Sequence, residues 1–552
     1  MMKRKVTLAG LVLLMAAGLV FAGGGGQQSS GSTAAGSKPT LSVGMQTDAF
    51  ISDYKNNYLT QYMEQLHNIN IEFYMLPSDN TELRTKLALM VASNDLPDVI
   101  MTNALPQETI LDYGSKGAFL DLTKYYNDPA KSPNYAKISA EDKALILNTV
   151  TMADGKIYSL VSFQPETWNL TPNRLYFNRE WAAKLGLKPP TTTEELRQVL
   201  IAFRDRDPNG NGRKDEIGVY GWFNGGYGEN ITTALINSFI FYNPNNLALD
   251  RTGNTVIAPF ADPAFRKALQ YLNTLYKDGV LAASLFTDDQ QTFRSVLNSN
   301  PPVVGITTAG SVGNWPNADH NPNYLAMAPL LPPLTGPEGV SYTSYTEYVP
   351  GHIAFITSKA RDPELAWKFA ESFYGEDPSI SSRFGQEGLD WSRKPEDLAK
   401  TKNSFVDMGL YPSLTLLQLR DVWTKPFAQH WRNINPRYMP LERGNTVGLL
   451  DPPYDPSLPS QVHGAVNYEY YYPRHPQYIL PALKYNLADA TKLGEPITNI
   501  NDYVKQAIAE FTIGTRDVNN DAAWNTYLQD MQNMGLNDWV SISQTTYNRQ
   551  KR

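Results

Sequence analysis

Residues 41–46, LSVGMQ, open an alternation of elements that decides the fold. This short apolar run predicts a strand, residues 54–67 have helical spacing, and IEFYML at 71–76 predicts a second strand. A helix over 81–93 continues the series, and residues 96–100 lead into a third strand. Strands that alternate with helices are typical of a mainly parallel sheet. We therefore expect an α/β protein.

The same alternation continues toward the middle of the chain. Residues 175–178 predict a strand, and 179–185 predict the helix after it. Thr192 or Thr193 can cap the next helix, over 194–204, which carries acidic residues in its first turn. That helix runs directly into a segment rich in Asp, Asn and Gly.

This segment, DRDPNGNGRKDE at residues 205–216, places oxygen-bearing side chains at alternate positions with glycines between them. Calcium is held by six to eight oxygen ligands at about 2.3–2.6 Å, and glycine takes the positive φ angles of a tight loop. The segment fits an EF-hand loop in one register. That register uses Asp205, Asp207 and Asn209 as positions one, three and five, Gly210 at the turn and Glu216 at position twelve.

A compact register that opens at Asp207 fits the calcium loop as well. Its ligands are Asp207, Asn209, Asn211, the carbonyl of Arg213, Asp215 and Glu216. So dense a run of oxygen ligands is rare by chance, which favours Ca²⁺ over a metal-free surface turn. A loop of this kind in a long extracellular chain is a structural staple, so we expect the function to lie elsewhere.

Length and composition limit the remaining classes. The 552 residues exceed what one hydrophobic core usually serves, which predicts two lobes, with three as the alternative. The net charge of −7 comes without a basic block, which argues against nucleic acid and anionic membranes as partners. The chain contains no cysteine, which excludes disulfides, a thiol nucleophile and a thiolate metal site.

The first 22 residues predict export. Lys3, Arg4 and Lys5 precede an apolar run over 6–20, and Val20-Phe21-Ala22 offers small residues for cleavage before Gly23. The run is shorter than the ~20 residues of a membrane span. Residues 23–38 form a Gly/Ser/Gln-rich linker with nothing to bury.

Several motifs together resemble those of a known family. They are LPDVI at 96–100, GAFLDLT at 117–123, GKIYSL at 155–160, LYFNREWAAKLGLKPPTTTEEL at 175–196 and the loop at 205–216. In this order and spacing, the chain resembles bacterial extracellular solute-binding proteins of family 1, the sugar-binding subunits of ABC importers. It is most similar to the long members that resemble alginate-oligosaccharide-binding proteins. Segments 265–281, 293–311, 349–377, 385–391 and 524–540 agree, so the resemblance spans about residues 40–545.

The resemblance implies a two-lobe α/β periplasmic-binding-protein fold of type II, with a ligand cleft between the lobes and hinge crossovers. Lobe one would comprise 39–158 and 301–356, and lobe two 159–300 and 357–552. Closure of the hinge around the ligand would be the functional motion. The resemblance also favours the compact register of the calcium loop over the EF-hand register.

The function that the resemblance implies is capture of a carbohydrate, expected to be an oligosaccharide, and its delivery to the membrane permease subunits of an ABC importer. Many relatives carry a lipid-anchored cysteine after the signal, whereas this chain has Gly23 there, so we expect an unanchored protein in the periplasm. We also expect a monomer. No GxSxG, HExxH or P-loop motif occurs, and we expect no enzyme activity. A secreted polysaccharide-degrading enzyme and a ligand-binding sensor of the same fold remain alternatives.

A sugar site needs aromatic side chains for ring faces and planar polar side chains for hydroxyl groups. The candidates in segments expected at the cleft are Trp168, Asn178, Arg179, Trp222, Tyr227, Trp315, Tyr345, Glu347, Glu387 and Trp391. For each aromatic residue, packing in a core is the alternative. Asn178 and Arg179 also sit where they can simply begin a helix. The identity, length and charge of the sugar stay open.

Overall fold

The computed structural model describes residues 38–345, 347–405, 411–418, 422, 425–451 and 453–551. The predicted signal peptide (1–22) and all but the last residue of the predicted linker (23–38) lie outside these residues. All helices and strands discussed below belong to one compact unit, residues 40–552. None of the helices in the described ranges is long and apolar enough to cross a membrane.

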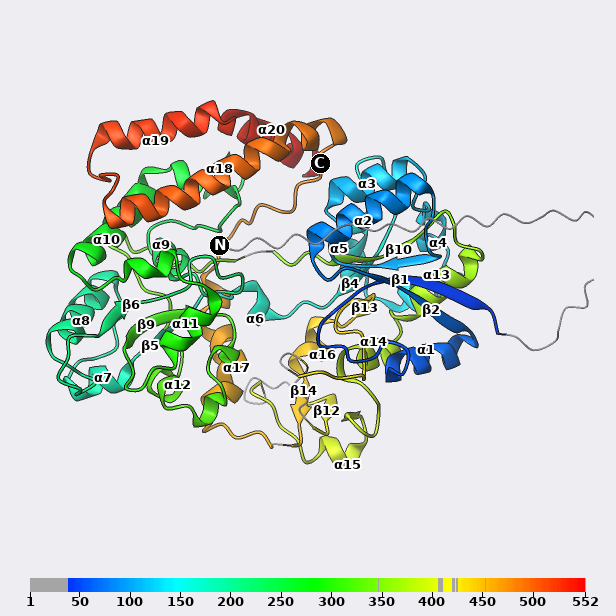
Figure 1. Ribbon diagram of the computed structural model, residues 1–552, viewed down its shortest axis with the longest axis horizontal. Coiled ribbons are helices and arrows are strands. Elements are labelled where there is room, and N and C mark those ends of the chain that lie inside the picture. The colour runs from blue at the N-terminus through cyan, green and yellow to red at the C-terminus, as the bar shows by residue number, and fades with distance from the viewer. Residues whose placement is uncertain are drawn as a thin grey trace, which may run out of the picture. The chain divides into compact units, whose positions relative to one another are not determined.

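A six-stranded sheet, shown in Figure 1, has the order β13-β4-β10-β3-β1-β2. β1 is parallel to both β2 and β3, as the alternation predicts, whereas β10 is antiparallel to β3 and to β4. β1, β3 and β4 therefore end at the same edge. The strands are β1 (Thr40–Gln46), β2 (Asn70–Leu76), β3 (Val99–Met101), β4 (Leu160–Phe163), β10 (Gly351–Ile356) and β13 (Arg437–Tyr438).

Helices with capped starts and apolar faces accompany this sheet. Leu83 and Leu87 of α2, one turn apart, are fully buried, and Asp79 caps that helix by accepting from two backbone amides. Burying such faces on the sheet is the main stabilising term of the lobe. The helices are α1 (Tyr58–His67), α2 (Asn80–Ser93), α3 (Gln107–Ser115), α4 (Thr123–Tyr126), α5 (Ala140–Val150), α13 (Pro363–Ser372) and α14 (Glu376–Phe384).

A second sheet has the order β5-β9-β6, with β5 antiparallel and β6 parallel to β9. Its strands are β5 (Arg174–Phe177), β6 (Ile217–Val219) and β9 (Val304–Ala309), and a separate hairpin pairs β7 (Ala248–Leu249) with β8 (Val256–Ile257). As predicted, Thr192 begins α8, where it forms a capping box with Glu195. The helices around this sheet are α7 (Arg179–Lys184), α8 (Thr193–Asp205), α9 (Ile231–Ile236), α10 (Pro263–Lys277), α11 (Gln290–Leu297), α12 (Pro322–Met327), α17 (Pro459–Tyr470), α18 (Leu487–Ile513), α19 (Asp521–Asn533) and α20 (Leu536–Gln550).

A small third sheet joins β11, β12 and β14 around its own apolar cluster of Ile380, Trp391 and Leu414. Its strands are β11 (Trp391–Ser392), β12 (Leu414–Leu416) and β14 (Val447–Leu449), with α15 (Pro395–Leu398) and α16 (Leu441–Asn445) beside them in sequence. α6 (Thr167–Leu170) lies on the first chain crossover, between the last strand residue of β4 and the first of β5.

Two large hydrophobic cores confirm the two-lobe α/β prediction, but the predicted boundaries differ from the strand pairing. Residues 301–356 were expected in lobe one, yet β9 pairs only with β5 and β6, and Trp315 packs in the core around that second sheet. The chain returns to the six-stranded sheet at β10. Residues 357–552 were expected in lobe two, yet Trp367 and Trp431 belong to the hydrophobic core around the six-stranded sheet. A strand's apolar sequence does not say which of two sheets it joins.

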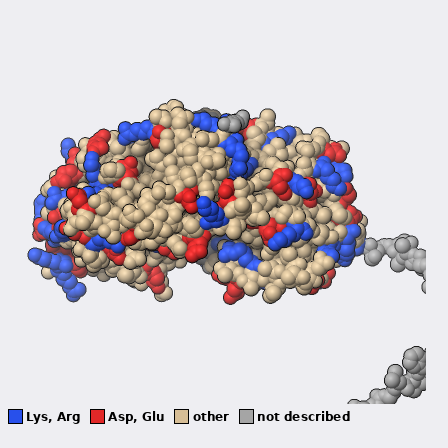
Figure 2. Space-filling model, turned by 90° about the horizontal axis from the view of Figure 1, so that it is seen from above, with Lys and Arg blue, Asp and Glu red and all other residues tan. Residues whose placement is uncertain are grey.

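From here, the first lobe means the residues around the six-stranded sheet, and the second lobe those around β5-β9-β6. The chain crosses between them at 164–173, at 345–350 and again between β14 and α17. On the face shown in Figure 2, basic and acidic side chains are intermingled, so the net charge of −7 is not gathered into one field there.

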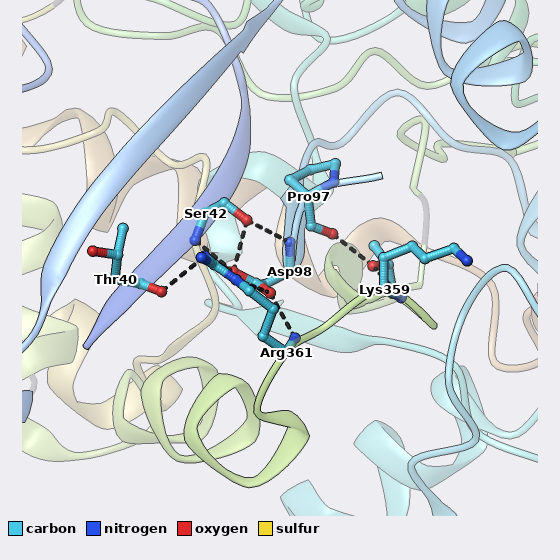
Figure 3. Close-up of polar contacts among 7 residues, drawn as sticks. Thr40, Ser42, Pro97, Asp98, Lys359 and Arg361 are labelled. Atoms are coloured by element: carbon cyan, nitrogen blue, oxygen red, sulfur yellow. Dashed lines mark hydrogen bonds and ion pairs between the residues drawn. The ribbon is translucent and has the colours of Figure 1, made fainter. Parts of the chain in front are cut away.

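A buried carboxylate joins three distant segments of the first lobe (Figure 3). Asp98 precedes β3 and accepts hydrogen bonds from the backbone amide and the hydroxyl of Ser42, both at 2.7 Å. Arg361, after β10, donates to it from its backbone amide and from Nη2, both at 2.8 Å. The same Nη2 donates to the carbonyl of Thr40 at 2.8 Å. The LPDVI motif therefore serves the fold of this lobe.

Candidate functional site

Polar side chains gather where strands of the first lobe end. Gln46, the last residue of β1, accepts from the hydroxyl of Thr102 at 2.7 Å and from the amide of Asn103 at 3.2 Å. Both partners directly follow β3. In open α/β sheets, ligands bind beyond the carboxyl ends of the strands. The first crossover, residues 164–173, begins at the same edge, because it follows β4.

A chain of hydrogen bonds runs along this crossover from one lobe to the other. Arg437 of β13 donates to Gln164 Oε1 at 2.8 Å, and Gln164 Nε2 donates to Glu166 Oε1. Asn169 Nδ2 donates to Glu166 Oε2 at 2.8 Å, and the Tyr227 hydroxyl donates to Asn169 Oδ1. Side chains of both lobes are therefore linked through the crossover itself, which we name the crossover chain.

The first-lobe end of the crossover chain is a buried cation. Arg437 is 1 % exposed and also donates to the hydroxyl of Ser382 at 3.0 Å and to its carbonyl at 2.9 Å. Burial lowers the pKa of Arg437 to about 9, and the charge of Glu166 acts in the opposite direction. The guanidinium stays charged at neutral pH, so Gln164 is held by a charge-assisted hydrogen bond.

The second lobe holds the other side of the crossover with a second buried arginine. Arg174 at the start of β5 donates to the carbonyl of Trp168 at 2.9 Å and to the carbonyl of Gly310 at 2.5 Å. Its Nε is buried, and no described residue accepts a well-aligned hydrogen bond from it. Arg174 thereby fastens α6 to the end of β9, which places Trp168 and Asn169 beside the loop that carries Tyr227.

Two adjoining cavities lie beside the second crossover. The larger, about 420 Å³, is lined by residues of the 223–230 loop, by 242–245 and by α18. The smaller, about 290 Å³, is lined by residues between 241 and 247, by residues of 345–349 and by 479–483. Asn243 and Asn245 line both, so the two are neighbours, and we name them the crossover cavities.

The lining of the crossover cavities combines amides with aromatic rings. The aromatic residues are Phe223, Tyr242 and Phe260 in the larger cavity, and Phe241, Tyr345, Tyr485 and Trp539 in the smaller one. The amides are Asn173, Asn224, Asn230, Asn243, Asn245, Asn246 and Asn501. Thr233 also lines the larger cavity, and its buried hydroxyl has no hydrogen-bond partner. Such a lining offers faces for stacking and donors and acceptors for hydroxyl groups.

Two of the predicted site residues line the crossover cavities. Tyr345 accepts at its carbonyl from Asn243 and contacts the His475 ring at 4.3 Å between ring centroids. Burial raises the pKa of Tyr345 to about 12, so its phenol remains a hydrogen-bond donor at neutral pH. Glu347 follows on the same crossover and lines the smaller cavity.

Trp168, Tyr227 and Trp222 are not among the residues that line the cavities, and the first two lie at the first crossover. Trp168 is partly exposed in α6, and Tyr227 is bonded to Asn169 of the same helix. Trp222 is partly buried, and its backbone amide and carbonyl hold the 223–230 loop through Glu229 and Gly225.

Other predicted residues serve the fold. Trp315 is 1 % exposed between Tyr176 and Tyr324, and Trp391 is fully buried with its indole donating to the Gly385 carbonyl. Their Gly- and Asn-rich neighbours predicted loops, but packing of the large rings places both side chains in cores.

Asn178, Arg179 and Glu387 are also engaged elsewhere. Asn178 caps α7 by accepting from the amide of Trp181 at 3.0 Å, and its own amide donates to the carbonyl of Val304. Arg179 donates to the carbonyls of Pro329 and Leu330, both at 3.2 Å. Asn178 cannot meet a ligand without giving up these partners, whereas Arg179 uses two of its five N–H donors in its bonds.

Glu387 lies on the rim of the small third sheet, where it pairs with Arg393 at 3.4 Å. The side chain is half exposed, so this ion pair contributes little to stability. Glu387 lines neither crossover cavity.

Sequence reasoning missed Gln164, Glu166 and Asn169 of the crossover chain and Asn243 and Asn245 of the cavities. The first three lie in QPETWN, which was noted only for its tryptophan. The Asn pair lies in YNPNN at 242–246, a polar run after an apolar helix. In the sequence, polar runs after strands or buried helices could have indicated these residues.

The calcium loop adopts the turns that its glycines predict. Gly210 and Gly212 have φ angles of 73° and 74°. Asp207 Oδ1 accepts from the amides of Gly210 and Asn211, and its Oδ2 accepts from Gly212. Asp207 therefore sits at the centre of the loop, as the compact register requires. Asp205 instead pairs with Arg204 at 2.7 Å.

Glu216 is the member of the loop that lacks a side-chain partner. The residue is 9 % exposed, and neither carboxylate oxygen makes a well-aligned hydrogen bond to the described residues. Burial raises its pKa, the backbone amides of Glu216 and Asn209 act in the opposite direction, and the charges of Asp207 and Asp215 raise it. A buried carboxylate beside two others is costly, and a bound cation would offset that cost.

The other loop side chains satisfy each other. Asn209 and Asn211 donate to Asp215, at 3.0 Å and 2.9 Å. Among the described residues, no three His, Cys, Asp or Glu side chains converge as a metal cluster. A half-turn of each amide about its last bond would present oxygen in place of nitrogen. The residues present therefore fit a hard cation through mixed carboxylate and amide oxygens.

Comparisons with known proteins agree on one family. A profile described as bacterial extracellular solute-binding protein matches residues 49–378. The fructooligosaccharide ABC transporter substrate-binding protein FusA of Streptococcus pneumoniae is 24 % identical over 512 residues, which are 90 % of this chain and 88 % of FusA. The structure of a FusA EF-hand mutant in complex with fructo-nystose has a TM-score of 0.71 at 22 % identity, over 93 % of this chain and 99 % of that one.

Two further structures share the fold. An HMO-binding, ABC-transporter-associated solute-binding protein of Bifidobacterium longum infantis has a TM-score of 0.74 at 20 % identity, over 93 % of this chain and 99 % of that one. The alginate-binding protein AlgQ2 without calcium ion has a TM-score of 0.63 at 20 % identity, over 93 % of this chain and 98 % of that one. Since the family profile matches more than half of the sequence, the chain belongs to the bacterial extracellular solute-binding protein family.

Proposed function

We propose that the protein is an extracytoplasmic receptor that captures an oligosaccharide and delivers it to the permease subunits of an ABC importer. The family supports a binding role, and the relatives named above are named for fructooligosaccharide, HMO and alginate binding. They are named as binding proteins, not as enzymes, and we propose that this chain has no catalytic role. It acts as a monomer in the periplasm after cleavage of its signal peptide.

The main support for this proposal comes from the crossover cavities. Their volumes, about 420 and 290 Å³, lie in or near the range of about 300–1,000 Å³ that is usual for small-ligand sites. Their walls contain both amides and rings, and Tyr345 belongs to a crossover and a cavity at once. A sugar bound there would contact the segment that must move when the lobes close. Ligand binding is therefore coupled to lobe movement.

The crossover chain would be the second part of this coupling. Its links at Gln164, Glu166 and Asn169 are side-chain hydrogen bonds, which can break and re-form while the backbone of the crossover turns. Trp168 and Tyr227, next to this chain, are the aromatic residues that we propose to contact the ligand from the first crossover.

We further propose that the 205–216 loop binds Ca²⁺ in the compact register and thereby stabilises the second lobe. The unpaired, buried Glu216 supports this, as does the central position of Asp207. Two relatives are described with reference to an EF-hand or to calcium. The cation would neutralise three neighbouring carboxylates and would take no part in holding the sugar.

A thermal-shift screen of the exported protein in saturating Ca²⁺ tests the proposed function. The panel contains neutral and uronic oligosaccharides of two to six units, with amino acids and short peptides as controls. A ligand at 100 times its Kd adds about 2.7 kcal/mol to the free energy of unfolding, which gives a clear shift. A shift by sugars alone supports the proposal. A shift by peptides alone contradicts the ligand class, and release of shorter sugars during incubation contradicts the non-catalytic role.

A further inference from the structure

The charged groups of the crossover cavities are few and nearly balanced. Of all the residues that line the two cavities, only Glu347, Asp502 and Lys505 are charged, which leaves one net negative charge. Lys505 is the single cation, and its Nζ lies 6.0 Å from the centroid of the Phe223 ring. Among the described residues, no arginine lines either cavity.

An acidic sugar would meet an unfavourable field there. A uronate oligosaccharide carries one carboxylate on every ring, and a carboxylate removed from water needs a cation or several donors to offset its lost hydration. The guanidinium fork that suits carboxylates is absent from the lining. Arg179, which the sequence offered for that role, is engaged by the carbonyls of Pro329 and Leu330 instead.

The neutral polar groups match a hydroxyl-bearing ligand. Asn224, Asn245 and Asn501 line the cavities, and their side chains make no hydrogen bond to the described residues. Each amide offers two donors and one acceptor, the same mixture that a pair of sugar hydroxyls requires. The buried hydroxyl of Thr233, also without a partner, adds a group of the same kind to the larger cavity.

The two neighbouring cavities together suit a ligand of more than one ring. Because Asn243 and Asn245 border both, a ligand that fills both extends past these residues on either side. Phe223 in the larger cavity and Trp539 in the smaller one offer separate stacking faces. A ligand of several rings can use both faces.

From this lining we infer that the crossover cavities bind a neutral oligosaccharide, of more than one ring, and discriminate against uronate oligosaccharides of the same length. The inference rests on the proposed function and adds the charge class of its ligand. The amides of Asn224, Asn245 and Asn501 would form hydrogen bonds with the hydroxyl groups of the sugar. The net negative charge of Glu347, Asp502 and Lys505 would repel carboxylates.

Titration calorimetry of the exported protein tests the inference with four trisaccharide-sized probes. 1-Kestose and maltotriose are the neutral probes, and trigalacturonate and trimannuronate are the acidic ones. We expect at least one neutral probe to bind, and both acidic probes to bind at least about tenfold more weakly, a difference of about 1.4 kcal/mol. Asn245→Asp, which removes a donor and adds a negative charge, should weaken the neutral probe by about tenfold.

Asn94→Asp is the matched control for Asn245→Asp. Both asparagines are exposed and both have left-handed backbones, with φ angles of 61° and 66°, but Asn94 ends α2 in the first lobe. Asn94→Asp should leave the Kd unchanged. The exposure of both positions means that neither variant should impair folding, and a melting curve verifies this.

The outcomes separate the inference from the proposed function. Tighter binding of an acidic probe overturns the inference and leaves an oligosaccharide receptor. Binding of a neutral probe that neither Asn245→Asp nor Phe223→Ala weakens places the sugar outside the crossover cavities, and this also overturns the inference. No binding of any sugar, here or in the thermal-shift panel, overturns both.

Discussion

The guanidinium of Arg437 donates to Gln164 Oε1 at 2.8 Å, and so the last strand of the first sheet holds the start of the first crossover. The acceptor lies on the segment that must change direction if the lobes move. The donor lies in the core of one lobe, 1 % exposed. Replacing either partner should therefore change the free energy of unfolding as well as the affinity for the ligand.

Gln164→Leu removes one acceptor from the buried Arg437 and one donor from Glu166. We expect a loss of about 1–3 kcal/mol in the free energy of unfolding, because a charged donor is left without its partner. Urea unfolding measures this loss. Gln198→Leu is the control, since Gln198 is exposed on α8 and bonds only to Glu194. Equal effects of the two variants would contradict a special role for Gln164.

The Asp98 carboxylate should make the first lobe sensitive to acid. Burial opposes ionisation, but hydrogen bonds from Arg361 and Ser42 outweigh it and lower the pKa to about 2, from 3.8. A lowered folded-state pKa gives stability that is present above about pH 4 and is lost as the pH falls toward 2. The shift corresponds to about 2 kcal/mol.

Asp98→Asn should therefore lower stability at pH 7 and flatten its decline between pH 4 and pH 2. Urea unfolding at a series of pH values gives both quantities. Asp112→Asn is the matched control, because Asp112 forms only an exposed pair with Lys116 and should change neither. An acid dependence that persists unchanged in Asp98→Asn would refute this assignment.

Removal of Ca²⁺ by a chelator should lower the melting temperature by several degrees, because the buried Glu216 then lies unpaired near two other carboxylates. Glu216→Gln should abolish most of this calcium-dependent shift, since it removes both the charge and one ligand. Differential scanning calorimetry with and without Ca²⁺ is the measurement.

Asp205→Asn distinguishes the two registers of the calcium loop. In the compact register Asp205 is no ligand, in keeping with its pairing to Arg204, so calcium affinity should stay unchanged. In the EF-hand register it is the first ligand, and the affinity should fall by more than tenfold. Calcium titration of this variant decides between them.

Trp168 should report lobe movement through its fluorescence. It is partly exposed in α6, on the first crossover, and its carbonyl is held by Arg174. A ligand that closes the lobes should change its surroundings, so Trp168→Phe should remove most of the ligand-induced fluorescence change. Trp315→Phe, in a core, should retain it. The reverse pattern would argue against movement at the first crossover.

Local structure was predictable because local rules decide it. The strand at 71–76, the helix at 81–93 and the capping of α8 by Thr192 follow from spacing and caps, and the structure confirms them. The positive φ angles of the calcium loop follow from its glycines. Each of these depends on residues a few positions apart.

The site was less predictable because it depends on packing between distant segments. Trp315 has the flanking residues of a loop, and its burial depends on Tyr176 and Tyr324, which arrive from other elements. Likewise β9 has an apolar sequence that suits a strand, but its partners β5 and β6 lie much earlier in the chain. The residues next to Trp315 and next to β9 in the sequence do not specify these partners.

The insertion of the second lobe into the first sets an order of events during export. β10 lies between β3 and β4 in the sheet, yet in the sequence it follows the whole β5-β9-β6 sheet, and Arg361 is later still. A chain emerging from the membrane in N-to-C order would have an open sheet edge at β3 until then, and Asp98 would lack its Arg361 partner. Open edges invite aggregation, and contacts this distant along the chain form slowly. A holding chaperone outside the membrane should therefore raise the yield of this protein more than that of one whose sheets are built from consecutive segments.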